Sequence, residues 1–277
     1  MTRKNKNLIF IAYLLLVLGA LSMILPFLWM LVTSFMGNSQ IFSYPPNFFP
    51  KPFIVENYSG IITQMPLFRY FLNSLFVSIV TTFGQIVIAA MAGFAFAKLN
   101  FKFKEPLFLL ILLTMMIPPQ VNIIPLFYVM KELHWIDTFQ ALILPGFFGG
   151  FGVFLMRQWF KSMPDALFEA AKIDGCNIFQ SFFKIALPLA LPAVATLAIF
   201  TFVSSWNGFM WPLIVTNSDG MRTLPVALAI YKSSFREITL WGELLACSVI
   251  CSIPVIAVFL AGKKYFINDI LQGGVKE

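Results

Sequence analysis

The side chains that could carry chemistry are few, and their spacing fits no catalytic or metal site. Glu169 and Asp174 lie five residues apart, so on a helix they face different sides and do not form paired carboxylates. His134 is the only histidine, and the three cysteines are scattered through apolar sequence, where small packing residues are expected. No phosphate-binding GxxxxGK[ST] string occurs, so this chain should not hydrolyse ATP by itself. We expect a non-enzyme without a metal or cofactor.

The elements that must position the remaining polar groups are apolar helices. The 277 residues are 59% hydrophobic and 11% charged, whereas soluble domains carry about 25% charged residues. A membrane-spanning helix needs about 20 apolar residues, and six such helices would use nearly the whole chain. The sequence therefore predicts an all-α, polytopic membrane protein with one transmembrane domain over 1–277. The expected spans are 8–36, 70–97, 105–130, 138–160, 189–216 and 241–262, with a loop at 162–188 and a polar loop at 217–240.

The basic residues predict the orientation of these spans. With the N-terminus in the cytoplasm, thirteen of the 19 lysines and arginines fall on the cytoplasmic side and six on the external side. This bias obeys the positive-inside rule, and six spans bring both termini to the cytoplasm. Topology alone explains the net charge of +7, so no nucleic-acid partner is expected, and the surroundings are membrane lipid.

Two adjacent prolines interrupt the third expected span. Pro118 and Pro119 remove two backbone donors near its middle and predict a break or sharp kink. Carbonyl groups freed at that depth must find partners in protein or in a water-lined cavity. Two interpretations follow: a packing kink, or a bend that lines a pathway together with Gln120 and Asn122.

The loop 162–188 carries clear helix start and stop signals. Ser162 with Asp165 has the spacing of a capping box, Pro164 suits a first helical turn, and Gly175 suits a left-handed stop. Asn177 can cap a second short helix. We expect a helix over roughly 163–174 and a second one ending near Pro188, which together form a small knob on the cytoplasmic side.

The same loop resembles the EAA loop of binding-protein-dependent ABC importer permeases. The matching positions are Glu169, Ala170, Ala171, Gly175, Ile185, Leu187 and Pro188. In that family the loop docks into a cleft of a cytoplasmic ATPase. The resemblance therefore implies that these residues, together with the neighbouring Asp174, couple this chain to a separate ATPase.

The likeness covers most of the chain and is closest to the carbohydrate branch, of the maltose-permease G-subunit type. It is carried by Lys98-Leu99-x-Phe101-Lys102, Met115-Met116-Ile117-Pro118-Pro119-Gln120-Val121, Phe154-Leu155-Met156-Arg157-Gln158 and Ser205-Trp206-Asn207-Gly208-Phe209-Met210-Trp211-Pro212-Leu213. It implies a bacterial inner-membrane importer of sugars or polyols that contains a second homologous permease, two ATP-binding cassette subunits and an external solute-binding protein. Gly208 departs from the pattern, because an acidic residue commonly follows the Trp-Asn pair.

A sugar pathway needs flat aromatic faces for the C–H-rich rings and amide or hydroxyl groups for the sugar oxygens. Trp206, Asn207 and Trp211 offer both, although the two tryptophans are five residues apart and point in different directions. An aromatic belt or helix packing is the alternative interpretation. The rival function is an ion-coupled secondary transporter, but such carriers usually hold charged groups within their spans. The expected spans of this chain hold almost none; Glu243 lies near an end.

Overall fold

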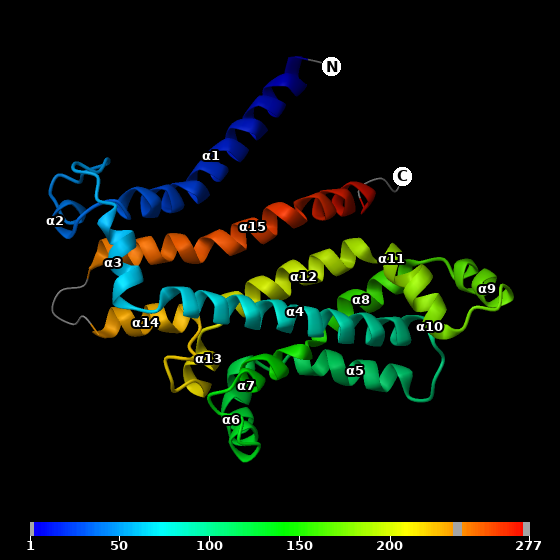
Figure 1. The fold of residues 1–277 in the computed structure, drawn as a ribbon. Coiled ribbons are helices and arrows are strands. Elements are labelled where there is room, and N and C mark those ends of the chain that lie inside the picture. The colour runs from blue at the N-terminus through cyan, green and yellow to red at the C-terminus, as the bar shows by residue number, and fades with distance from the viewer. Residues whose placement is uncertain (1–2, 235–239, 274–277) are drawn as a thin grey trace. The chain divides into compact units, whose positions relative to one another are not determined.

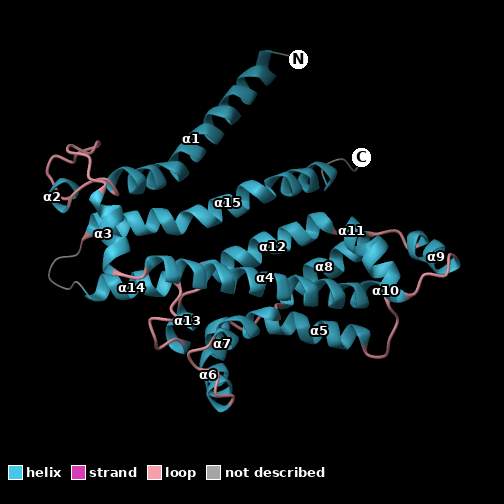
Figure 2. Cartoon of the chain, viewed as in Figure 1, coloured by secondary structure: helices cyan, strands magenta, loops and turns pink. Residues whose placement is uncertain are grey.

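The computed structural model describes residues 3–234 and 240–273, and these contain helices and loops but no strand (Figures 1 and 2). The expected all-α fold is therefore confirmed. In chain order the helices are α1 (Arg3–Thr33), α2 (Asn38–Ile41), α3 (Glu56–Gln64), α4 (Leu67–Lys98), α5 (Lys104–Met115), the 3₁₀ turn η1 (Pro119–Asn122), α6 (Ile123–Glu132), α7 (Phe139–Ile143), the 3₁₀ turn η2 (Leu144–Phe147), α8 (Gly150–Ser162), α9 (Ala166–Ile173), α10 (Ile178–Ser181), the π-helical turn η3 (Phe182–Ala186), α11 (Leu187–Leu189), α12 (Leu191–Trp206), α13 (Met210–Val215), α14 (Leu224–Ser234) and α15 (Trp241–Gly273).

Four stretches of the described residues are long and apolar enough to cross a membrane without a sharp bend. They are Ile9–Thr33, Leu67–Lys98, Phe139–Ser162 and Trp241–Lys263. Two further candidates are bent pairs: Lys104–Met115 with Pro119–Glu132, at 94°, and Ile178–Leu189 with Leu191–Trp206, at 75°. The first bend lies at Pro118 and Pro119, where two missing backbone donors predicted it.

Two expectations for the C-terminal third are wrong. The fifth span does not run unbroken to 216, because α12 ends at Trp206 and Asn207 closes it before α13 begins at Met210. The stretch 217–240 is not simply a polar loop, because it contains α14. The sequence interpretation gave weight to the polar residues on either side of α14 and overlooked the apolar segment between them, of which Leu224, Val226 and Ala227 are buried. Residues 235–239 of the expected loop lie outside the described part.

The chain divides into two compact units. The first contains residues 1–68 and 228–253. Within it, the Asn57 side chain donates hydrogen bonds to the backbone oxygens of Ser34 and Met36, at 2.9 and 3.0 Å, and so fixes α3 against the end of α1. The Tyr231 hydroxyl donates to Gln64 and Glu243, which joins the end of α14 to α3 and α15.

The second unit, residues 69–227 and 254–277, contains the elements that position the candidate site. Its main core packs α4, α8 and α12 around buried alanines together with Val153, Met156 and Leu197. Gly93 of α4 faces the backbone of Arg157, where an added Cβ would lie 2.8 Å from its nitrogen. The lack of a side chain at Gly93 therefore allows the backbones of α4 and α8 to approach closely.

Candidate functional site: the loop 162–188 and the cavities of the second unit

The loop between α8 and α12 folds into two short helices separated by Gly175. Gly175 has a φ of +79°, a left-handed conformation that stops α9 and that glycine adopts without strain. Asn177 then starts α10 with a reciprocal capping box: its side chain accepts from the Gln180 backbone at 2.8 Å, and the Gln180 side chain accepts from the Asn177 backbone at 2.9 Å. The predicted stop and the predicted second cap are both confirmed.

The predicted start of the first helix is wrong. The Ser162 hydroxyl donates back to the Trp159 carbonyl at 2.7 Å, within α8, and so makes no capping box with Asp165. Consequently α9 begins at Ala166, and Pro164 lies before its first turn.

A single lysine fastens the start of α9 to the end of α4. The Lys98 ammonium donates to the Asp165 carboxylate at 2.6 Å and to the Met163 carbonyl at 2.7 Å, and it lies 4.9 Å from the centre of the Phe168 ring. Its side chain is only 8% exposed, whereas that of Asp165 is 80% exposed. The hydrogen bond and the positive charge of Lys98 lower the pKa of the Asp165 carboxyl group.

Four aromatic rings join the loop to the helix bundle. The Phe94 ring of α4 lies 5.6 Å from that of Phe160, 5.9 Å from that of Phe168 and 5.3 Å from that of Phe182, measured between centroids. These partners belong to α8, α9 and η3 respectively. We call these four residues the Phe94 cluster. Because close-packed interiors transmit strain, a displacement of α9 or η3 is expected to reach α4 and α8 through the ring contacts of this cluster.

The residues that the sequence assigns to coupling divide into two groups. Glu169, Ala170, Asp174, Gly175 and Pro188 are exposed, and Glu169 makes no hydrogen bond or ion pair within the described ranges. By contrast, Ala171, Ile185 and Leu187 are buried or half-buried and hold the loop in place.

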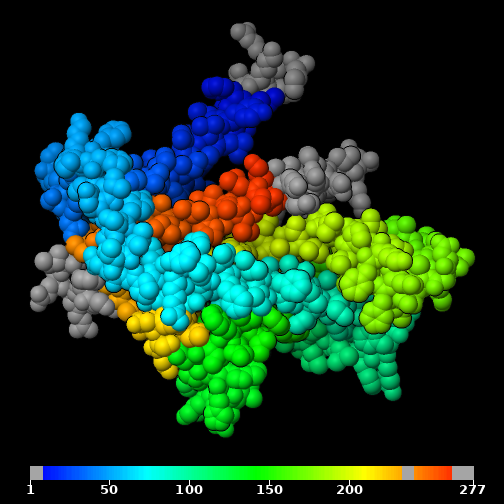
Figure 3. Space-filling model, in the orientation of Figure 1, coloured from blue at the N-terminus to red at the C-terminus, as the bar shows by residue number. Residues whose placement is uncertain are grey.

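Large apolar side chains next to these residues face outward. Ile173 is 86% exposed and Phe179 is 66% exposed, and Figure 3 shows this segment, in yellow-green, as a projection at one end of the second unit. Beside it lies a hollow of about 630 Å³ lined by residues from α4, α9 and α10, including Lys98, Lys172 and Phe179. The sequence interpretation missed the contributions of Phe94 and Lys98, although a short loop with four phenylalanines between two apolar spans is a usable signal.

The five residues expected to line a pathway do not all lie together. Trp206 is 2% exposed and packs against the rings of Phe71, at 5.5 Å, and Phe202, at 5.9 Å. Asn207 is exposed and ends α12. Trp211 contrasts with both, because it lines two cavities.

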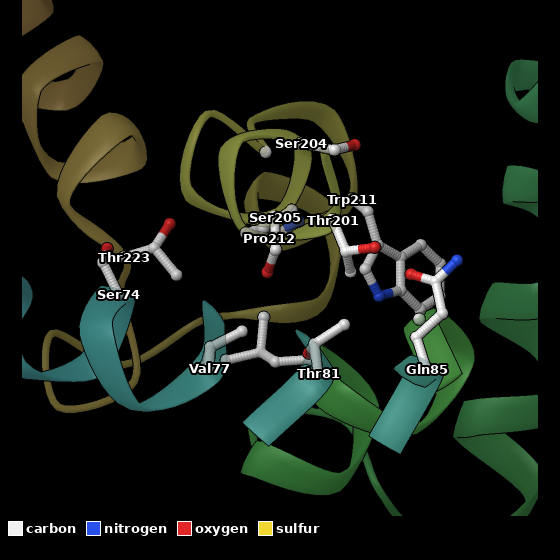
Figure 4. A pocket seen from close by; sticks show the side chains of 13 residues that line it. Ser74, Val77, Thr81, Gln85, Thr201, Ser204, Ser205, Trp211, Pro212 and Thr223 are labelled. Atoms are coloured by element: carbon white, nitrogen blue, oxygen red, sulfur yellow. The ribbon is translucent and has the colours of Figure 1, made fainter. Parts of the chain in front are cut away.

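Both cavities lie within the second unit. One, of about 220 Å³, lies at the α5–α6 break and brings Gln120, Asn122 and Trp211 together. The other, of about 200 Å³, lies between α4, η2, α12 and α13, and we call it the α4–α12 cavity (Figure 4). Its wall includes Gln85, Ser205 and Gly208. The indole nitrogen of Trp211 donates to the Ala141 carbonyl at 2.8 Å, which fixes the ring between the two cavities.

The sequence comparison decides the family. Residues 85–271 match the family described as binding-protein-dependent transport system inner membrane component. The chain belongs to this family. The match includes the whole loop 162–188 and Trp211.

Individual relatives agree with this assignment. The arabinooligosaccharides transport system permease protein AraQ of Halalkalibacterium halodurans is 36% identical over 256 residues, which cover 91% of each chain. The sn-glycerol-3-phosphate transport system permease protein UgpE of Yersinia enterocolitica is 29% identical, over 98% of this chain and 99% of its own. A crystal structure of a bacterial ABC transporter that imports the acidic polysaccharide alginate contains a chain with the same fold, with a TM-score of 0.85, 23% identity and coverage of 96% and 99%.

Proposed function

We propose that this permease forms half of the translocation pathway of an ATP-driven importer for sugars or related polyols. Its partners are a second homologous permease, two ATP-binding cassette subunits and an extracytoplasmic solute-binding protein. The names of relatives that handle arabinooligosaccharides and glycerol phosphate support the solute class. A more distant structural neighbour, with a TM-score of 0.64, is in complex with an alginate-loaded periplasmic protein, and this supports the external partner. The family description supports a location in the bacterial inner membrane, and the bias of basic residues supports an orientation with both termini and the loop 162–188 inside.

The observation that carries the proposal is the exposed yet firmly held projection formed by α9 and α10. Exposed apolar side chains beside a hollow mark an interaction surface, and here they include Ile173 and Phe179. The residues that resemble the coupling motif lie on the same projection. A cytoplasmic ATPase subunit is the partner that this surface fits, and Glu169, free of partners within the described ranges, is available to bind it.

Coupling then proceeds from the loop to the bundle. When ATP binding closes the ATPase dimer, the docked α9 and α10 move with it. The Phe94 cluster and the Lys98 contacts pass this movement to α4 and α8, and η3 and α11 pass it to α12. The helices rotate as packed bodies, and the pathway opens alternately to the two sides. Gly175 allows α9 and α10 to meet at a turn while the loop moves.

The test uses the assembled importer in proteoliposomes, with ATP hydrolysis measured in the presence of loaded binding protein. Glu169→Lys and Gly175→Asp should abolish stimulated hydrolysis and import while the four-subunit core still purifies intact. Glu132→Lys, a charge reversal at an exposed site outside the loop, is the matched control and should behave as wild type. Normal stimulation in both loop variants would refute the coupling assignment. Uptake that survives ATP depletion and collapses with the ion gradient would instead support the rival, ion-coupled transporter.

A further inference from the structure

The α4–α12 cavity lies where two interrupted helices meet. η2 interrupts the passage from α7 to α8 at Pro145 and Gly146, and residues 207–209 separate α12 from α13. Helix interruptions at membrane depth are tolerated where they line a cavity. Figure 4 shows Val77, Thr81 and Gln85 of α4 facing this cavity across from Ser205 and Pro212.

The cavity wall is polar but uncharged. Six of its residues are serine or threonine, one is Gln85, and no lining residue is acidic or basic. The hydroxyl-bearing members are Ser74, Thr81, Thr201, Ser204, Ser205 and Thr223. Of these, Ser74 already accepts from the Leu224 backbone at 2.7 Å. Gly208 also adds no charge. Such a wall suits a neutral ligand that carries several hydroxyl groups, because an anion would be buried here without a compensating charge.

Two of the lining hydroxyl groups lack a partner. The side-chain oxygens of Thr81 and Thr223 are buried and make no hydrogen bond, and the two residues are only 5% and 4% exposed. Elsewhere in the same unit, buried threonines bond to the carbonyl four residues earlier: Thr82 donates to Ser78 at 2.6 Å and Thr216 to Pro212 at 2.7 Å. Buried polar groups are normally hydrogen-bonded, and both residues line the cavity, so a side-chain rotation that turns either hydroxyl inward would let an occupant pair it.

The dimensions and the aromatic wall narrow the choice of occupant. The cavity volume of about 200 Å³ is below the roughly 300–1,000 Å³ of pockets for drug-sized ligands, so it suits a single ring. Trp211 presents a flat apolar surface whose position is fixed by its bond to Ala141. Trp211 also lines the cavity of Gln120 and Asn122, so this one ring borders both cavities.

We propose that the α4–α12 cavity is a transport subsite, within this subunit alone, for one ring of a neutral, hydroxyl-rich solute. Thr81 and Thr223 supply hydrogen bonds to the ring hydroxyls, and Trp211 packs against its C–H face. This inference rests on the proposed function and refines it: the solute is a neutral sugar or polyol rather than a phosphorylated or uronic acid compound. The competing occupant is ordered water alone.

Import by the assembled importer, with its own binding protein in proteoliposomes, tests this subsite. The labelled probes are arabinotriose, sn-glycerol 3-phosphate and an alginate trisaccharide. Arabinotriose is expected to be imported and the two anions are not. Thr81→Val and Thr223→Val keep the side-chain shape but remove the hydroxyl, and each should lower arabinotriose import by about five- to tenfold, the effect of one lost hydrogen bond.

Stability measurements separate a transport role from a structural one. Because the hydroxyls of Thr81 and Thr223 have no partner in the protein, their replacement by valine should not lower the melting temperature of the complex. The matched control is Thr82→Val, which breaks an existing hydrogen bond one residue along the same helix and should leave import unchanged.

Protection of an introduced cysteine measures occupancy directly. In a variant with Cys176, Cys247 and Cys251 replaced by serine, Thr223→Cys should react with a small thiol reagent during turnover, and arabinotriose should slow this reaction. Wild-type import by Thr81→Val and Thr223→Val, or labelling that the probe does not slow, would overturn the subsite and assign the hydroxyls to water. Preferential import of an anionic probe would overturn the neutral class. Failure of the wild-type importer to transport any of the three probes would instead count against the proposed function.

Discussion

Replacement of Phe94 by alanine is predicted to disconnect the loop from the bundle without preventing assembly. Phe94 is 5% exposed, and the removal of a buried phenylalanine side chain costs about 3–5 kcal/mol. Two of its three ring partners in the Phe94 cluster, Phe168 and Phe182, belong to the loop. At about 0.5–1.5 kcal/mol for each ring pair, these two contacts contribute roughly 1–3 kcal/mol to the attachment of the loop. A change of this size alters an equilibrium by about 5- to 150-fold.

The assay compares import with ATP hydrolysis in proteoliposomes, together with the melting temperature of the purified complex. Phe94→Ala should lower both the melting temperature and the number of solute molecules imported for each ATP hydrolysed. Phe202→Ala is the matched control: Phe202 is 6% exposed in α12, and its ring stacks at 5.9 Å on Trp206 rather than on the loop. This control should lower the melting temperature by a similar amount while the ratio of import to hydrolysis stays normal.

Two results would refute the reasoning. If Phe94→Ala keeps the normal ratio of import to hydrolysis despite its lower melting temperature, the Phe94 cluster does not transmit the movement. If Phe202→Ala lowers the ratio equally, the loss is a general effect of a weakened core. Phe94→Leu, which restores most of the volume but not the ring contacts, should give an intermediate ratio.

Of three further predictions, two concern the fastening of the loop and the third concerns the contact between α5 and α8. Gly175→Ala places a Cβ at a φ of +79°, which should destabilise the turn by about 1–2 kcal/mol and speed protease cleavage there; cleavage at the wild-type rate would contradict this. Because Lys98 lowers the pKa of Asp165, this ion pair stabilises the loop above the ordinary carboxyl pKa, and its contribution is lost as the pH falls through the lowered value. Protease sensitivity should therefore rise only below about pH 4 in the wild type, whereas Lys98→Met should be sensitive and indifferent to pH across that range. Arg157 is 8% exposed, and its guanidinium donates to the Glu105 carboxylate at 2.7 and 3.0 Å. Glu105→Leu removes this carboxylate and should destabilise the complex by about 1–3 kcal/mol, because the buried guanidinium loses its partner. In a double-mutant cycle measured by thermal unfolding, the additional change Arg157→Met should recover part of the lost stability.

Features that depend on neighbouring residues could be predicted from the sequence. The bend at Pro118 follows from missing backbone donors, the turn at Gly175 from its conformational freedom, and the start of α10 from the side chain of Asn177. The start of α9 could not be predicted in the same way. The Ser162 hydroxyl can either accept from the backbone at the start of α9 or donate to a carbonyl of α8, and in the structure it donates to the Trp159 carbonyl.

Features that depend on contacts between residues far apart in the chain could not be predicted from the sequence. The tether from Lys98 to Asp165 and the packing of Phe94 join segments far apart in the chain, so neither spacing nor composition reveals them. The same limit applies to the tryptophans. Spacing predicted that Trp206 and Trp211 point in different directions, but only the packing of Phe71 and Phe202 places Trp206 in the core.

The long separation between Phe94 and its partners has a consequence for biogenesis. During synthesis α4 emerges first, and Phe94 has no complete set of partners until Phe160, Phe168 and Phe182 have also left the ribosome. In an incompletely inserted chain the loop 162–188 is therefore not yet packed against α4 and α8, even when Glu169 and the residues around it have already been synthesised. Under the proposed function, ATPase subunits that dock on this loop would therefore bind a fully inserted chain in preference to an incomplete one.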